Sequence, residues 1–426
     1  MSYKDNAFKE RIIKMKKLLT KTLIFLLSIT LCFGLVACGD DDGDTVQTTG
    51  FKYKIITEER DVEGSTTGEK EEYKYAVITG FEISSEDAEK IENGDYSTVV
   101  NDDVNWRELV IPETYKKGDK TYNVEKIEAA ALAGHTLFTS ITVGSNITSI
   151  GEGAFGGCTN LKTLSIPFVG ASLDAVGAER VFAYLFGAAN SGDGNTEIST
   201  KTGLRVNSNG NEIVEEEAST YYFPTSLDTV KITGGDKVPA CAFYGMTTLK
   251  NIELAPSIKD IDNHAFTGCT ALRSVDLSNV ENVYAFAFSG CTALKSIEFG
   301  ATPTLESLWQ DAFAGCSNLC SSVLNDDALT TLKLPSSLKI LKKSAFEACA
   351  SIKTLDLSAI QVNEIEGSTF ANCTKLEKIT FKNGMVVKTG AFANCMKLTK
   401  EKLLGDFTFE IASFYADLQE KLEQGE

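Results

Sequence analysis

The stretch Ile258–Phe299 reads IKDIDNHAFTGCTALRSVDLSNVENVYAFAFSGCTALKSIEF and carries one pattern twice. Phe266 and Phe288 lie 22 residues apart, as do Cys269 and Cys291. A fixed period of about this length is typical of a solenoid, in which no coil can bury its apolar face alone. We therefore expect the chain to be organised around stacked copies of this coil.

Each copy of the pattern predicts a short strand and a tight turn. Val275-Asp276-Leu277 alternates apolar and polar residues, as a strand with one buried face does. Ala265-Phe266 and Cys269 have the spacing of a helical or 3₁₀ turn, and Gly268 relaxes the backbone before the cysteine. Stacked coils would form a parallel β-sheet on one side, short helical or 3₁₀ turns, and an interior ladder of phenylalanine, cysteine and leucine.

One anchor position recurs across residues 109–398, which we interpret as the repeat solenoid. Its occupants are Leu132, Phe155, Phe243, Phe266, Phe288, Phe313, Phe346, Phe370 and Phe392. Most gaps fall within the range of about 20–29 residues used by leucine-rich repeats. The longest gap predicts an insertion at about residues 168–222 or two degenerate coils, and another gap predicts an enlarged loop around Cys320–Asp327. The Gly- and Asn-rich middle of the insertion, residues 190–211, could be a functional loop or a tolerated surface insertion.

The segments that flank the repeats predict caps for the open ends of the solenoid. In residues 51–108, Phe51–Ile56 and Tyr73–Ile78 are rich in β-favouring residues and predict a β-hairpin. In residues 399–426, apolar positions four and five apart over Phe409–Leu422 predict a terminal helix.

The repeated signature resembles the BspA-like leucine-rich repeat family. It stands once as Ala154-Phe155 followed by Cys158, Leu161 and Leu164, and it recurs around Phe313, Phe346, Phe370 and Phe392. The resemblance implies a curved, parallel-sheet solenoid on a bacterial surface. It also implies adhesin-like binding of host matrix proteins or other cells, although a fold alone does not determine function.

The N-terminal residues 1–37 resemble a lipoprotein signal peptide with its start at Met15. Lysines precede an apolar run over Leu23–Ala37, which is short for a membrane span, and the run ends in Leu-Val-Ala before Cys38. This tetrad resembles the lipobox of bacterial lipoproteins, in which Cys38 is lipidated. An ordinary signal peptide or a short anchor helix is the alternative.

Residues 38–50 form an acidic, flexible tether in this interpretation. The run Gly39–Asp44 resembles the surface-export signal of lipoproteins in Bacteroides-type bacteria, which would place the protein on the outer membrane, facing the cell exterior. A solvated acidic linker is the alternative. The net charge of −18 disfavours nucleic acid as a partner, so we expect membrane contact through the lipid anchor only.

The cysteines predict core packing rather than chemistry. Seven of the eleven share one repeat position: Cys158, Cys269, Cys291, Cys316, Cys349, Cys373 and Cys395. Cysteine packs well as a small buried hydrophobe, so we expect a ladder of free thiols, although stacked coils could bring neighbouring sulfurs within disulfide range.

We expect no catalysis, metal or cofactor. The chain has only two histidines, His135 and His264, and neither belongs to a recognisable nucleophilic or metal-binding arrangement. The position of His264 holds Gly, Cys, Phe, Asp or Ser in other coils, which predicts an exposed or partly exposed side chain.

The strands predict the partner-binding face, as an acidic column beside a basic one. Its candidate residues are Lys250, Glu253, Arg273, Asp276, Lys295, Glu298, Lys353 and Asp356. The columns could neutralise each other through weak lateral pairs, or they could select a charged protein partner. They lack aromatic residues, which disfavours a glycan-binding sheet and leaves the loops as the place where a glycan could bind.

These observations predict a non-catalytic, lipid-anchored surface protein that binds a protein partner as an adhesin does. One alternative is a structural or accessory lipoprotein of the envelope. Another is a glycan-capture component of a surface uptake system.

Overall fold

The computed structural model describes residues 50–62, 70–84, 87, 89–90, 107–188, 195–200, 204–206, 212–214, 219–320, 330–399, 402–405 and 407–409. The expected signal peptide and Cys38 lie outside these residues, as do the tether before Gly50 and most of the expected C-terminal helix. Within the described residues, no helix is long and apolar enough to cross a membrane.

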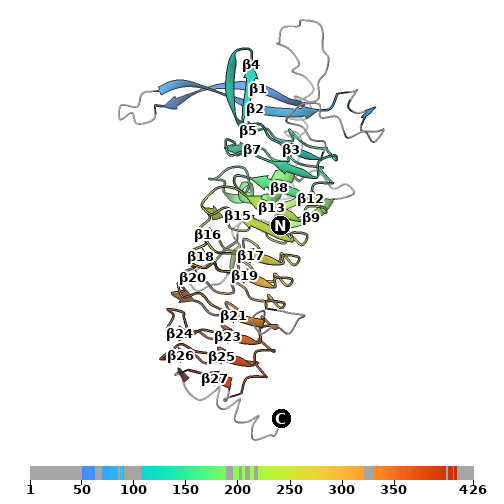
Figure 1. The fold of residues 1–426 in the computed structure, drawn as a ribbon. Helices are drawn as coiled ribbons and strands as arrows, with labels where there is room; N and C mark the ends of the chain where they lie inside the picture. The colour runs from blue at the N-terminus through green and yellow to red at the C-terminus, as the bar shows by residue number, and fades with distance from the viewer. Residues whose placement is uncertain are drawn as a thin grey trace, which may run out of the picture. The chain divides into compact units, whose positions relative to one another are not determined.

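The repeats form the predicted solenoid, and among the described residues the equivalent strands of successive coils pair in parallel in runs of five, two and four (Figure 1). We refer to these strands together as the first sheet. They are β3 (Glu108–Val110), β6 (Ser140–Thr142), β8 (Thr163–Ile166), β13 (Thr229–Ile232), β15 (Asn251–Leu254), β17 (Ser274–Asp276), β19 (Ser296–Glu298), β21 (Thr331–Lys333), β23 (Thr354–Asp356), β25 (Lys378–Thr380) and β27 (Leu403–Leu404).

Most coils also carry a second parallel strand, commonly of two residues, which was not predicted because two residues give little periodic signal. These strands pair in three separate runs, and we refer to them together as the second sheet. They are β5 (Lys120–Ile127), β7 (Ser149–Ile150), β14 (Lys237–Val238), β16 (Asp260–Ile261), β18 (Asn282–Val283), β20 (Ser307–Leu308), β22 (Ile340–Leu341), β24 (Glu364–Ile365), β26 (Met385–Val387) and β28 (Phe407–Phe409).

The core contains the expected phenylalanine ladder. From Phe243 to Phe392, successive rings stack with centroids 4.9–5.5 Å apart and interplanar angles of 1–6°. The backbone N–H of each ladder residue from Phe243 to Phe370 donates to a carbonyl of the following coil, as Phe266 does to Ala287 at 2.7 Å. The aromatic stack and the backbone ladder therefore run along the same line.

The seven repeat cysteines form a second interior ladder, as predicted. All are free and buried. The Sγ atom of each lies 3.1–3.4 Å from a carbonyl oxygen of the preceding coil, as Cys291 does from Phe266. A thiol is a weak donor that suits this position, because it satisfies a carbonyl without bringing a charge into the core.

The repeat position that His264 occupies is defined by its backbone conformation. The expectation that the His264 side chain is exposed is wrong. His264 is completely buried, and its ring stacks on that of Phe286 at 4.8 Å. The residues at this repeat position share a positive φ: Gly153, Cys241, His264, Phe286, Asp311, Ser344, Ser368 and Gly390. The residue before the repeat cysteine is also left-handed, as at Gly268 with φ of 74°, where glycine avoids steric strain.

The insertion adds one layer of phenylalanine rings to the core, and it adds no strand to the first sheet. Strand β8 pairs directly with β13. Between the two coils lie the 3₁₀ helices η1 (Gly177–Arg180) and η2 (Phe182–Phe186), and the rings of Phe182 and Phe186 bridge Phe155 to Phe243. The expected loop over residues 190–211 instead includes parts of two strand pairs: β9 (Asn195–Thr200) with β12 (Ser219–Pro224), and β10 (Leu204–Val206) with β11 (Glu212–Val214).

The N-terminal segment forms a hairpin that continues the second sheet. Strands β1 (Gly50–Asp61) and β2 (Lys70–Glu82) are antiparallel, and β2 pairs in parallel with β5. Strand β4 (Thr114–Lys117) pairs with β5 as well.

At the other end, β27 and β28 carry both sheets beyond the expected limit at residue 398. The predicted helix over Phe409–Leu422 lies outside the described residues, apart from Phe409, which ends β28.

Candidate functional site

The outer face of the first sheet carries the predicted partner-binding residues. In β17, Val275 points into the core at 2% exposure, whereas Asp276 is exposed. The same alternation exposes Glu253 and Glu298 at equivalent places in β15 and β19. Lys250, Arg273, Lys295 and Lys353 each lie one residue before a strand of this sheet. The structure therefore places the eight residues in the two expected columns.

Near the two ends of these columns, opposite charges are paired. Lys231 Nζ lies 3.0 Å from a Glu253 carboxylate oxygen, and Lys250 Nζ lies 3.1 Å from Asp228. At the other end, Asp356 lies 4.0 Å from Lys333. Asp228 and Lys231 come from the coil of β13 and were not predicted as members of the columns. Their 22-residue distance from Lys250 and Glu253 was the signal that could have identified them.

At the centre, charges of like sign stack beside one another. Asp276 and Glu298 are register partners in β17 and β19, and Lys295 donates a backbone hydrogen bond of 2.8 Å to Arg273. All four side chains are exposed, and none forms an ion pair within the part of the chain that the structure describes. We call Arg273, Asp276, Lys295 and Glu298 the central patch. Like charges side by side on a sheet are destabilising.

Asp276 is held in place within the central patch. Its Oδ1 atom accepts hydrogen bonds from the backbone N–H of Ser278, at 2.8 Å, and from the Ser278 hydroxyl. A preorganised carboxylate loses less side-chain entropy when it binds a partner. The predicted candidate Lys353 lies outside the central patch. Its neighbour Glu377 pairs with Lys397 at 3.0 Å, and this hydrogen bond lowers the pKa of Glu377.

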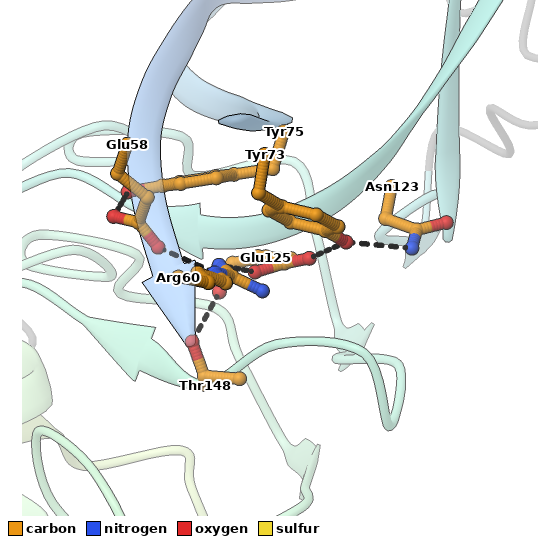
Figure 2. Close-up of polar contacts among 7 residues, drawn as sticks. All are labelled: Glu58, Arg60, Tyr73, Tyr75, Asn123, Glu125 and Thr148. Carbon is orange, nitrogen blue, oxygen red and sulfur yellow. Dashed lines mark hydrogen bonds and ion pairs between the residues drawn. The ribbon is translucent and has the colours of Figure 1, made fainter. Parts of the chain in front are cut away.

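A second polar cluster joins the N-terminal hairpin to the first coils (Figure 2). Arg60 of β1 binds Glu125 of β5 at 2.7 Å and Glu58 at 2.6 Å, and its guanidinium lies 3.7 Å from the ring centroid of Tyr73. The Tyr73 hydroxyl donates to Glu125 at 2.5 Å, so the pKa of Tyr73 is raised by this hydrogen bond and by burial. Because these groups already satisfy one another, the arrangement suits a structural fastening better than a binding site.

The thiols and histidines of the described region are placed for packing. Burial raises the pKa of Cys158 and of Cys291 to about 12, so neither thiol ionises near neutral pH. Burial also lowers the pKa of half-buried His135. Among the described residues, no group of three or more His, Cys, Asp or Glu residues could hold a metal ion.

Stacked coils with two parallel sheets, a phenylalanine ladder and a thiol ladder define a leucine-rich repeat solenoid. The BspA type leucine-rich repeat region matches the chain in six copies, over residues 119–179, 217–328 and 321–417. These matches span more than half of the chain, so the protein belongs to the BspA-type leucine-rich repeat family. A search of curated proteins finds no match.

Similar solved structures include three from bacteria. A leucine-rich repeat protein from Bacteroides ovatus is 20% identical, with 88% of this chain and 79% of that chain covered and a TM-score of 0.42. A leucine-rich cell surface protein from Faecalibacterium prausnitzii is 18% identical, with coverages of 89% and 98% and a TM-score of 0.28. The pneumococcal vaccine antigen PcpA is 15% identical, with coverages of 88% and 100% and a TM-score of 0.28.

Proposed function

We propose that the protein is a non-catalytic, surface-exposed lipoprotein that binds a protein partner through the first sheet, as an adhesin does. Leucine-rich repeat solenoids generally present extended surfaces that bind proteins. The central patch is the observation that carries the proposal. It is the stretch of the predicted columns where Arg273, Asp276, Lys295 and Glu298 leave their charges open to a partner.

The proposed location in the cell is based on the sequence that precedes the solenoid. The Leu-Val-Ala-Cys tetrad supports a lipid on Cys38, and the acidic run after it supports export to the outer face of the outer membrane. A Cys38→Ala variant should leave the membrane fraction, and protease applied to intact cells should digest the wild-type protein. Membrane retention of Cys38→Ala would contradict the lipid anchor, and protection from protease would contradict the outward orientation.

A binding screen tests the partner. The detergent-purified full chain is applied to host matrix proteins and to a glycan panel at physiological salt. We expect saturable binding to a matrix protein that Asp276→Lys/Glu298→Lys weakens by about tenfold or more. Glu113→Lys/Asp119→Lys makes the same change in net charge at exposed residues away from the central patch, and it should bind as the wild type does.

The other outcomes separate the alternatives. Equal loss of binding in the two double variants would contradict a site on the central patch. Binding to glycans alone would favour the glycan-capture component. Retention at the cell surface without binding to any matrix protein or glycan would favour a structural or accessory lipoprotein of the envelope.

A further inference from the structure

The second sheet carries a pair of stacked aromatic rings, of which Trp309 is exposed and Tyr284 is half-buried. Tyr284 follows β18 directly and Trp309 follows β20, and their ring centroids lie 5.9 Å apart with planes 24° from parallel. Trp309 is 38% exposed, and Ile340 of the next strand, β22, is 39% exposed. Because large apolar side chains are usually covered, this pair marks a candidate contact surface.

The indole of Trp309 is fixed by the sheet beneath it. Its Nε1 atom donates to the hydroxyl of Ser307 at 3.2 Å, and Ser307 donates in turn to Asn282 at 2.6 Å. Ser307 is 2% exposed, so water competes little for these bonds. A rigid aromatic side chain loses little conformational entropy on binding, which suits it as an anchor for a partner.

Two carboxylates extend the aromatic pair. Asp262 follows β16 directly, so it occupies the rung before Tyr284, and Asp260 accepts a hydrogen bond of 2.8 Å from Asn282. Burial raises the pKa of Tyr284, and the negative charges of Asp260 and Asp262 raise it further. The register neighbour of Asp260 is Lys237, which forms no ion pair with it within 4.0 Å.

Four other carboxylates of this sheet region are neutralised by lysines of adjacent coils. The pairs are Lys259–Glu281 at 3.7 Å, Lys339–Glu306 at 2.6 Å, Lys342–Glu366 at 3.0 Å and Lys388–Glu364 at 3.3 Å. Asp260 and Asp262 have no such partner among the described residues. Lys342, on the rung after Trp309, is held by Glu366 and leaves the aromatic pair open to another cation.

There is room for an incoming side chain beside Asp262. This residue lines a cavity of about 570 Å³ whose wall also includes Asp174, Asp236, Arg180 and Lys237. Leu173 and Val176, at the edge of the same cavity, are 59% and 74% exposed. Asp262 therefore belongs both to this cavity and to the coil position beside Tyr284, and the cavity wall carries acidic, basic and apolar side chains.

We propose that Asp260, Asp262, Tyr284 and Trp309 bind an arginine-containing segment of a partner protein. We call these four residues the aromatic–acidic surface. A guanidinium is planar, stacks on aromatic rings and forms paired hydrogen bonds with a carboxylate, so it satisfies both halves of the surface. The net charge of −18 attracts such a segment from a distance. This surface lies on the second sheet and is separate from the central patch.

Tryptophan fluorescence tests the proposal. The full chain contains only two tryptophans, so a Trp106→Phe background leaves Trp309 as the single indole reporter. A hexa-arginine peptide, titrated in detergent at physiological salt, should shift or quench this emission with a saturable curve. A hexa-lysine peptide should bind about threefold to tenfold more weakly, because lysine lacks the planar fork.

Calorimetry with matched variants locates the binding. Trp309→Ala should weaken hexa-arginine binding by about tenfold and Asp262→Asn by about threefold. Glu306→Gln removes one negative charge from a paired carboxylate of the same sheet and should bind within about twofold of the wild type. Circular dichroism of each variant shows that the solenoid is folded.

Several results would overturn the proposal. One is that hexa-arginine and hexa-lysine bind with equal affinity and that Asp262→Asn and Glu306→Gln weaken hexa-arginine binding equally. These results together would indicate attraction by the overall negative charge of the protein rather than by a specific site. A second is saturable quenching by a neutral oligosaccharide and none by either peptide, which would make the aromatic pair a glycan platform. Asp276→Lys/Glu298→Lys should leave hexa-arginine binding within about twofold, so failure here and failure of the proposed function are distinguishable.

Discussion

The aromatic core is packed differently in the coils from Phe243 to Phe392 and in the N-terminal part of the solenoid. In the regular coils, each ring lies nearly parallel to its neighbours at 4.9–5.5 Å. Around the insertion, Phe186 is tilted by 55° from Phe155 and by 54° from Phe182, and beyond it a mixed polar cluster fastens the hairpin. Repetition therefore stabilises one region, and contacts that occur once stabilise the other.

Truncation of a ladder ring should give the largest difference between the regions. Phe288 lies between Phe266 at 4.9 Å and Phe313 at 5.0 Å, so Phe288→Ala removes two parallel stacks and leaves a cavity. We expect a cost of about 3–5 kcal/mol, and about 1 kcal/mol less for Phe186→Ala, whose ring contacts are tilted. Urea unfolding followed by circular dichroism, with hydrogen exchange to locate the change, measures both; equal costs would show that the ring geometry contributes little.

The thiol ladder should make the regular coils sensitive to alkali. Burial raises the pKa of Cys291 to about 12, whereas the unfolded thiol ionises near pH 9. Between these values the unfolded state releases a proton that the folded state keeps, so stability falls as the pH rises, by about 1.4 kcal/mol per pH unit for each such thiol.

Urea midpoints from about pH 8 to about pH 10.5 test this slope. Cys291→Ala should be less stable than the wild type at the lower pH, because it leaves a small cavity, and its midpoint should then fall less steeply. Parallel curves for the two chains would mean that the Cys291 thiol does not contribute to the alkaline loss.

Removal of Arg60 should loosen the N-terminal end and leave the regular coils intact. Arg60→Ala removes the ion pair of Arg60 with Glu125, which is 6% exposed. Glu125 then keeps the hydrogen bond from the hydroxyl of Tyr73. We expect a cost of about 1–2 kcal/mol, reduced by the 37% exposure of the Arg60 side chain to water.

Hydrogen exchange should show faster opening of β1 and β2 in Arg60→Ala than in the control Lys52→Ala. The control removes an exposed ion pair with Glu82 and should cost under about 0.5 kcal/mol. Faster exchange throughout the coils of Phe243 to Phe392 would show that the hairpin and the regular coils unfold together.

Charges on the first sheet should give the smallest effects, with opposite signs at two places. Lys231→Ala breaks the pair with Glu253 and should destabilise the chain by about 0.5 kcal/mol. Arg273→Ala removes a cation beside Lys295 and should be neutral or stabilising by a few tenths of a kcal/mol. Thermal unfolding at low and high salt compares them; destabilisation by Arg273→Ala that salt weakens would reveal an attractive partner for Arg273 within the chain.

The regular coils were readable from the sequence because every one repeats the same side-chain contacts. The spacing of Phe266, Cys269 and Leu272 fixes which residues stack, and it predicted both ladders. The strand residues Asp276 and Glu298 were likewise placed correctly on one exposed face. The candidate face is therefore largely a consequence of the period.

Features that depend on backbone conformation or on distant contacts could not be read in this way. The varied residues at the position of His264 suggested exposure, but they share a left-handed φ, which no side-chain pattern reports. The rung contributed by Phe182 and Phe186 has no counterpart 22 residues away. The meeting of Arg60 with Glu125 depends on how the hairpin lies on β5, 65 residues further along the chain.

The directions of the two interior ladders bear on self-assembly. Each repeat thiol donates toward the N-terminal neighbour, and the ladder phenylalanine amides from Phe243 to Phe370 donate toward the C-terminal one, so the stack has two unlike ends. A head-to-tail contact between two copies would be heterologous, and such a contact grows into a filament when it does not close into a ring. Strand β2 occupies the edge of β5 where such growth would begin. We therefore expect the hairpin to hinder such growth at the edge of β5.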